Sequence, residues 1–207
     1  DTLVQVFSMI DGDEFERCFA EWVRQLTGLT SKVIAIAGQT PEGPTNLVER
    51  YDPQTDTWTR LADKPTAVSE VSAVLLGEKI YVPGGKLANG QVTNCLEVFD
   101  PRKGTWESKA ELPLAVSGYA LTAYEGQMYL FGGWDGVKES ASVFRYDPDT
   151  DIWQVMSPLP APLQGAQAVA EGAGIAILGG TRNGEAQTSH RVYFPGREGD
   201  GGSPWEL

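Results

Sequence analysis

Apolar runs recur along the chain at a nearly constant spacing, and each run ends at a pair of small residues. The pairs are Ala37-Gly38, Gly84-Gly85, Gly132-Gly133 and Gly179-Gly180, which lie 47, 48 and 47 residues apart. In the third run, MYLFGG, apolar residues do not alternate with polar ones, which is typical of a strand covered on both faces. The pattern predicts a series of similar units, each built around one buried strand.

Two further markers keep the same order in every unit. An aromatic-Asp-Pro triplet stands at Tyr51-Asp52-Pro53, Phe99-Asp100-Pro101 and Tyr146-Asp147-Pro148, with a degenerate copy at Tyr193-Phe194-Pro195. Seven residues beyond the aromatic residue comes a tryptophan, at Trp58, Trp106 and Trp153, and Trp205 closes the last unit after a glycine-rich insertion. Asp-Pro favours a turn, and we expect each tryptophan to cover the seam between adjacent units.

Each unit divides into four short strands separated by Gly, Pro, Asn and Asp. In the third unit the strands are predicted at 118–124, 127–131, 141–146 and 152–156. The paired glycines at the end of the second strand allow positive φ and a close approach of another backbone. We therefore predict an all-β fold.

These markers resemble the kelch repeat over about residues 31–207. The resemblance implies a kelch-type β-propeller of about four four-stranded blades, with units at about 31–64, 65–112, 113–160 and 161–207. The first blade is expected to be incomplete, because its opening strand is missing. Kelch proteins mostly have more blades than this chain supplies, so we expect either an open arc or self-association that completes the ring.

The N-terminal segment 1–30 has a different pattern and is predicted to form a helical appendage. From Asp13 to Thr27 apolar residues recur at intervals of three and four, as on one face of an amphipathic helix. Leu3, Val4 and the apolar residues that follow them predict a shorter helix ahead of it.

The stretch at about 11–40 resembles DDE insertion-sequence transposases of the H-repeat-associated group. In that family the strand VIAIDGKT carries a catalytic metal-binding aspartate, whose place is taken here by Ala37, and Gln39 replaces the lysine. Two-metal phosphoryl transfer needs several convergent carboxylates, and the kelch-like sequence downstream offers no counterparts. We therefore expect no transposase activity and interpret residues 31–40 as a fusion junction.

The formal net charge of −12 argues against nucleic acid and anionic membrane surfaces as partners. No apolar stretch is long enough to span a membrane and the first residues do not resemble a signal peptide, so we expect a cytoplasmic protein. Cys18 and Cys95 lie far apart and have no metal-ligand spacing.

No assembled catalytic, cofactor or metal site is expected. His190 is the single histidine, so the multi-histidine copper centre of oxidase members of the kelch superfamily cannot form. The segment DPDTDIW imitates a calcium loop but has Ile152 and Pro158 where that loop needs Gly and Glu. No predicted helix follows the glycine-rich stretches, so they are interpreted as hairpin loops rather than phosphate loops.

The loops after the glycine pairs remain as candidates, because function often lies on variable connections held by a rigid scaffold. We predict partner binding by residues of these loops: Lys86, Asn89, Trp134, Asp135, Arg182 and Asn183. The function predicted is a non-enzymatic binding module for another protein or a small ligand. The alternatives are a kelch-scaffold enzyme acting on a sugar-like substrate and a non-functional remnant of a transposase-kelch gene fusion.

Overall fold

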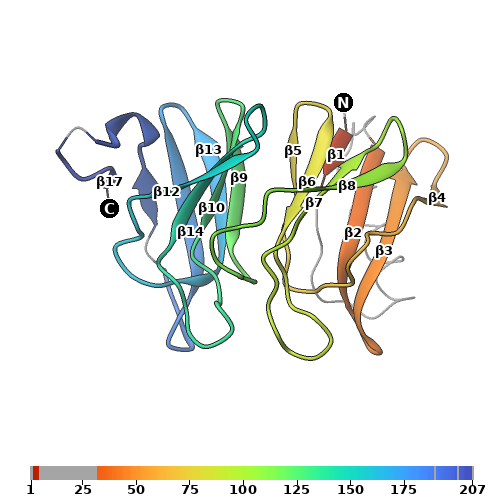
Figure 1. Ribbon diagram of the computed structural model, residues 1–207, viewed down its shortest axis with the longest axis horizontal. Helices are drawn as coiled ribbons and strands as arrows, with labels where there is room; N and C mark the ends of the chain where they lie inside the picture. The colour runs from red at the N-terminus through yellow and green to blue at the C-terminus, as the bar shows by residue number, and fades with distance from the viewer. Residues whose placement is uncertain (1, 5–31, 189, 200, 207) are drawn as a thin grey trace.

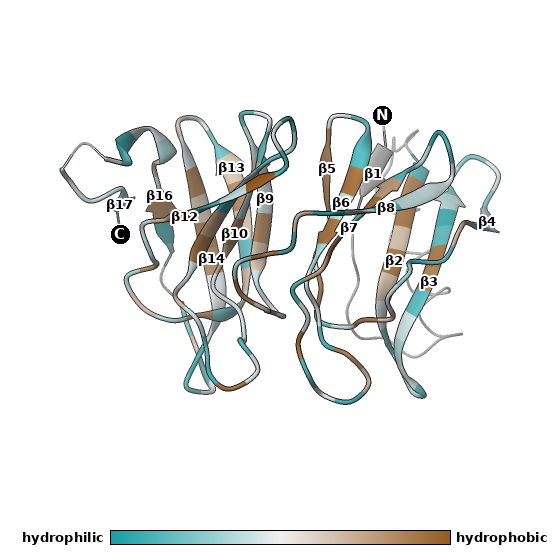
Figure 2. Cartoon of the chain, viewed as in Figure 1, coloured by the Kyte–Doolittle hydropathy of each residue, from teal (hydrophilic) through white to brown (hydrophobic). Residues whose placement is uncertain are grey.

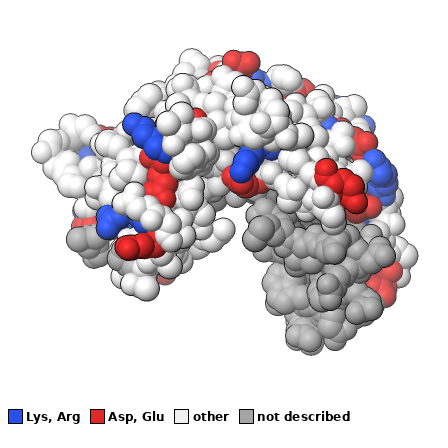
Figure 3. All heavy atoms as spheres, turned by 90° about the horizontal axis from the view of Figure 1, so that it is seen from below, with Lys and Arg blue, Asp and Glu red and all other residues white. Residues whose placement is uncertain are grey.

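The computed structural model of this protein describes residues 2–4, 32–188, 190–199 and 201–206. These residues form four separate β-sheets that stand side by side as the blades of a propeller (Figure 1). The sheets follow one another in chain order, so the first and fourth sheets form the two ends of an arch (Figure 3). The predicted all-β propeller of about four blades is confirmed.

The blades have the following strands. The first contains β1 (Thr2–Val4), β2 (Lys32–Thr40), β3 (Gly43–Asp52) and β4 (Thr57–Arg60). The second contains β5 (Val74–Leu76), β6 (Lys79–Pro83), β7 (Leu96–Asp100) and β8 (Thr105–Lys109). The third contains β9 (Ala120–Tyr124), β10 (Gln127–Phe131), β11 (Val143–Asp147) and β12 (Ile152–Met156). The fourth contains β13 (Gln164–Glu171), β14 (Gly174–Arg182), β16 (Arg191–Tyr193) and β17 (Trp205–Glu206), with β15 (Glu185–Ala186) paired to β14 and a short 3-10 helix, η1 (Pro195–Arg197), before β17.

The first blade differs from the prediction at its inner edge. No antiparallel opening strand precedes β2 within the described residues; instead β1 runs parallel to it, pairing Thr2 with Lys32 and Val4 with Ile34. The helix expected at Leu3 and Val4 is therefore wrong, because these residues form a strand that pairs with the edge of β2. The rest of the predicted helical appendage, residues 5–30, lies outside the described residues.

Apolar residues gather on the middle strands of the blades, while the connecting loops mix polar and apolar residues (Figure 2). The buried side chains form clusters at the seams between adjacent blades. At the first seam Ile34 and Ile36 of β2 pack with Ile80 and Val82 of β6. The second and third seams repeat this arrangement around Leu130 of β10 and Ile177 of β14. Each blade thus depends on its neighbours for its core.

The glycine pairs carry a backbone hydrogen bond across every seam. The second glycine donates its N–H to a carbonyl at the start of the next blade, from Gly38 to Val68 at 3.0 Å, from Gly85 to Val116 at 2.9 Å and from Gly133 to Leu163 at 2.8 Å. A Cβ added to Gly133 would lie 2.6 Å from the carbonyl oxygen of Ser117. The predicted close backbone approach is confirmed, and at Gly132 and Gly133 it leaves no room for a side chain.

The tryptophans close the outer part of the seams, as predicted. Trp106 and Trp153 each donate the indole N–H to a carbonyl of the preceding blade's exit segment, Ala62 and Ala110, both at 2.9 Å. Beside Trp153, the carboxylate of Asp151 accepts hydrogen bonds from the Tyr146 hydroxyl at 2.7 Å and from the Ala110 N–H at 2.9 Å. A single turn therefore supplies both an indole and a carboxylate to the seam.

The other seams use different groups for the same purpose. In the fourth blade Glu198 accepts from the N–H and the hydroxyl of Ser157, at 2.9 and 3.0 Å. The second blade has Gly104 at the turn position of Asp151, and its seam instead contains the ion pair of Lys64 and Glu97, of which Lys64 is fully buried. Thr66 also donates its hydroxyl to Glu97, at 2.7 Å.

Replacing Gly132 by alanine is expected to destabilise the protein much more than Gly126→Ala. Both glycines have positive φ, +63° and +77°, so both substitutions carry the cost of a left-handed alanine. Only at Gly132 would the new methyl meet backbone, the Leu163 oxygen at 2.3 Å; nothing lies within 4 Å at Gly126. In urea unfolding we expect losses of about 1 kcal/mol for Gly126→Ala and at least about 3 kcal/mol for Gly132→Ala. Equal losses would contradict the seam argument.

The Asp151 carboxylate makes the second seam, between the second and third blades, sensitive to acid. Burial acts to raise its pKa, but hydrogen bonds from Tyr146 and Ala110 outweigh burial and hold the pKa below its usual value. Its contribution to stability is therefore present above the unfolded-state pKa of about 3.9 and is lost as the pH falls through the lower folded-state pKa.

Asp151→Asn is therefore expected to lower the free energy of unfolding by about 1 to 2 kcal/mol at pH 7 and by much less near pH 2. Asparagine tolerates the left-handed backbone at this position, where φ is +56°, so the change tests the charge rather than the turn. Urea unfolding at both pH values measures the difference, with the exposed Asp149→Asn as the control. A loss that does not depend on pH would contradict the assignment.

Candidate functional site

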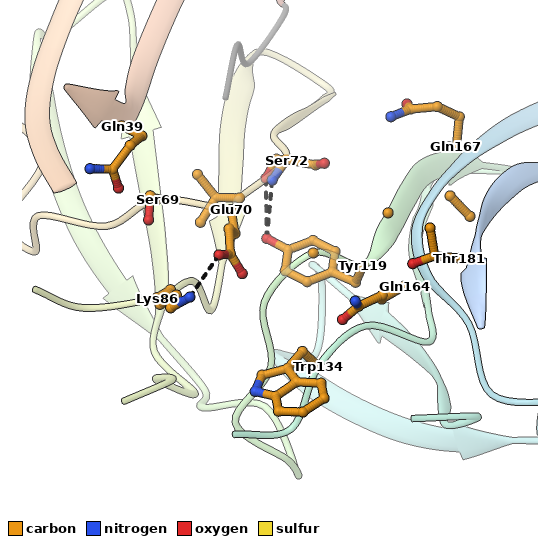
Figure 4. Close-up of a pocket in the computed structure, with 14 residues that line it drawn as sticks. Gln39, Ser69, Glu70, Ser72, Lys86, Tyr119, Trp134, Gln164, Gln167 and Thr181 are labelled. Atoms are coloured by element: carbon orange, nitrogen blue, oxygen red, sulfur yellow. Dashed lines mark hydrogen bonds and ion pairs between the residues drawn. The ribbon is translucent and has the colours of Figure 1, made fainter. Parts of the chain in front are cut away.

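A pocket of about 580 Å³ lies where the four blades meet, at the ends of their inner strands (Figure 4). Every blade contributes to its lining: Gln39 comes from the first, Ser69 and Lys86 from the second, Tyr119 and Trp134 from the third, and Gln164 and Thr181 from the fourth. The pocket is therefore a product of the arch and not of any single unit.

One repeat position supplies a wall residue from each blade. The residue after the glycine pair is Gln39, Lys86, Trp134 or Thr181, and all four line the pocket. Its backbone is fixed by a pair of hydrogen bonds: Trp134 and Ser117 exchange N–H to carbonyl bonds of 2.7 and 3.0 Å, and Lys86 and Ser69 do the same at 2.8 and 2.9 Å. The backbone is held alike in these two blades while the side chains differ.

A second set of lining residues comes from the segment that opens each blade. Glu70, Gly118 and Gly165 occupy equivalent places, and all have positive φ, at +54°, +60° and +66°. Ser72 and Gln167 lie close by on the same wall of the second and fourth blades (Figure 4). Ser72 and Gln167 carry neutral hydrogen-bonding groups, whereas Gly118 and Gly165 leave the wall open.

The charged groups of the pocket are paired with each other. The Lys86 ammonium lies 3.0 Å from Oε1 of Glu70, and the two side chains are 41% and 42% exposed (Figure 4). The other oxygen, Oε2, accepts a hydrogen bond from the buried Ser117 hydroxyl at 2.9 Å. Glu70 therefore links the second and third blades at the pocket wall.

Tyr119 forms the floor of the pocket and is nearly fully buried. Its hydroxyl donates to the carbonyl of Pro83 and accepts from the N–H of Ser72 at 3.3 Å. Burial raises the pKa of this hydroxyl far above its usual value, so it stays protonated. The neutral hydroxyl therefore bonds to backbone groups of the neighbouring second blade.

The six residues predicted from the loops lie in different places. Lys86 and Trp134 line the pocket. Asn89 bonds within its own loop to Gln91, and the Asp135 carboxylate accepts from the N–H groups of Val137 and Lys138. Arg182 ends β14, and the Asn183 N–H donates to Glu139 at 2.8 Å. These four residues lie outside the pocket lining.

The sequence prediction missed Gln39, Glu70, Gln164, Gln167 and Thr181 as pocket residues. Aligning the four units on their glycine pairs would have found Gln39 and Thr181, because they occupy the same repeat position as Lys86 and Trp134. The His190 side chain is exposed. Within the described ranges, no cluster of three or more His, Cys, Asp or Glu residues could hold a metal ion.

No helix among the described residues is long and apolar enough to cross a membrane. Of the transposase-like stretch, the structure describes only Lys32–Thr40, which forms β2 of the first blade. Ala37 has the left-handed backbone of the first glycine of a pair, with φ of +56°.

Comparison with known proteins supports the repeat assignment. The KLHDC2/KLHL20/DRC7 Kelch-repeats domain matches residues 24–194. Kelch-like protein 35 from Mus musculus is 28% identical over 197 residues, covering 95% of this chain and 32% of that protein. The Homo sapiens protein of the same name is 35% identical over 83% of this chain and 28% of its own length. Beta-scruin from Limulus polyphemus is 33% identical over 63% of this chain and 15% of its own length. The chain thus spans about a third or less of these relatives.

A solved structure has the same fold. The structure of YjhT superposes with a TM-score of 0.66 over 78% of this chain and 52% of that chain, at 16% sequence identity. Identity this low shows the fold alone. The domain match over most of the chain, with the glycine pairs and tryptophans at the blade seams, shows that this chain belongs to the kelch-repeat family.

Proposed function

We propose that this chain is a non-enzymatic binding module that recognises a segment of another protein at the pocket where its blades meet. The observation that carries the proposal concerns the residue after each glycine pair, whose side chain differs in every blade. The glycine pairs and aromatic residues beside it recur from blade to blade, whereas the pocket residue is Gln39, Lys86, Trp134 or Thr181 in turn. A scaffold constraint would favour similar side chains at this position, so their diversity supports recognition.

The lining suits a polypeptide. Gln39, Gln164 and Gln167 offer amides that both donate and accept, which matches the peptide groups of an extended segment. Trp134 adds a large apolar surface in the same pocket, and tryptophan is enriched among the residues that dominate binding energy. Figure 3 shows the described residues as an arch with a hollow on one side.

The charge of the chain supports a partner that is not strongly acidic. A formal net charge of −12 repels polyanions, including nucleic acid, and favours neutral or basic partners during encounter. The membership of the chain in the kelch-repeat family, together with its Kelch-like relatives, is consistent with protein binding.

The titratable side chains of the pocket support a non-enzymatic role. Among the described lining residues these are Glu70, Lys86 and Tyr119. Glu70 and Lys86 are paired with each other, and the Tyr119 hydroxyl is used by backbone groups. General acid or base chemistry needs a group that is available to the substrate.

Trp134→Ala is expected to weaken binding by about 2 kcal/mol, or about thirtyfold, because the indole is the largest apolar surface in the pocket. Short random peptides displayed on phage are selected on the wild-type protein, and the affinities of the enriched peptides are measured by isothermal titration calorimetry. Val137→Ala is the control, since Val137 is in the same loop, 82% exposed and outside the pocket lining.

Circular dichroism melts verify that both variants fold. The proposal fails if the wild-type protein enriches no peptide, or if Trp134→Ala binds the enriched peptides as tightly as the wild type does.

A further inference from the structure

Glu70 occupies a backbone conformation that its repeat counterparts reach with glycine. Its φ is +54°, and the equivalent Gly118 and Gly165 have +60° and +66°. A residue with a Cβ is strained in this region, whereas glycine is not. The second blade therefore keeps a glutamate where glycine would fit the backbone better.

The contacts of Glu70 point to the pocket rather than to stability. Its ion pair with Lys86 is about 40% exposed on both sides, and exposed pairs of this kind contribute little to folding. The carboxylate is nevertheless held in one orientation, because the buried Ser117 hydroxyl donates to Oε2 while Lys86 contacts Oε1. The strained backbone thus places an oriented carboxylate on the pocket wall, which is where retained strain accompanies a role in recognition.

The charge balance of the pocket depends on this one carboxylate. Among the described lining residues, Lys86 and Glu70 are the charged groups, and they lie 3.0 Å apart. An acidic group that approaches Lys86 therefore meets the Glu70 carboxylate at short range, and like charges placed together at an interface oppose binding. An uncharged polar group meets no such repulsion.

We infer that Glu70 is the specificity-determining residue of the pocket: by neutralising Lys86 it excludes acidic segments and selects uncharged ones. This inference rests on the proposed function and adds a class of ligand to it. Without Glu70, the Lys86 ammonium would be left as an unpaired cation in a pocket of neutral donors and acceptors. Such a pocket selects Asp and Glu.

The test compares the peptides selected by two variants of Glu70 with those selected by the wild type, from the same displayed library. Glu70→Gln removes the charge and keeps the size and the strained backbone. Glu70→Gly installs the residue of the sister blades, which relieves the backbone strain but removes the acceptor of the Ser117 hydroxyl, so its folding is verified by a melt.

Glu125→Gly is the matched control. Glu125 is also a left-handed glutamate, with φ of +49°, and Gly77 and Gly172 are its repeat counterparts, but it is exposed and outside this pocket. Glu125→Gly therefore relieves the same kind of backbone strain and leaves the charge of the pocket unchanged.

We expect Asp and Glu to be enriched at least about tenfold in the peptides selected by both Glu70 variants, relative to the wild type and to Glu125→Gly. The enrichment should decrease in high salt, because it is electrostatic. If the wild type selects peptides whose binding needs Trp134, and all folded variants select peptides of the same acidic content, the inference is overturned while the proposed function stands. If the wild type selects no peptide, both fail.

Discussion

The backbone hydrogen bonds from Gly38, Gly85 and Gly133 to the next blade are the contacts on which the arch depends. They join two backbones at a distance that a side chain would block, as the 2.3 Å approach of a Cβ at Gly132 to the Leu163 oxygen shows. Because the bond fixes the end of the inner strand in the first three blades, it also fixes the following residue, Gln39, Lys86 or Trp134, which lines the pocket. The geometry of the seam and the position of the pocket wall have the same cause.

Other contacts complete the seams without being identical. The indoles of Trp106 and Trp153 bond to the preceding blade in the same manner, but the charged partner changes from Asp151 to Glu198 and, at the first seam, to the Lys64–Glu97 pair. Gly104 stands where an aspartate would complete the first seam. A buried ion pair is costly to desolvate, so its stability depends on further hydrogen bonds such as the one from Thr66. The seams therefore have similar geometry, but different charged side chains complete them.

Much of this architecture could be predicted from the sequence, because its signals are local. The strands predicted from turn residues and apolar runs agree with β9 to β12 to within a few residues. The close approach at the glycine pairs and the place of Trp106 and Trp153 at the seams were predicted from the repeat. The parallel pairing of β1 with β2 was not predictable in this way, because it joins segments separated by a crossover whose register no local pattern specifies.

The pocket could be predicted in part. Lys86 and Trp134 were predicted because they lie in the loops that follow glycine pairs. Asn89 and Asp135 fulfilled the same criterion, but their side chains satisfy the backbone of their own loops. Glu70 was missed because a single glutamate gives no sign of a left-handed backbone; only its alignment with Gly118 and Gly165 does so.

In the first three blades the glycine pair joins the blade to its neighbour, and the residue after it lines the pocket. At the position after each glycine pair, the scaffold requires only the backbone, so the side chain is free to vary without disturbing a core. Such a division allows new recognition surfaces to arise by single substitutions in one unit at a time. The same four positions would serve as sites for randomisation in an engineered library built on one unchanged frame.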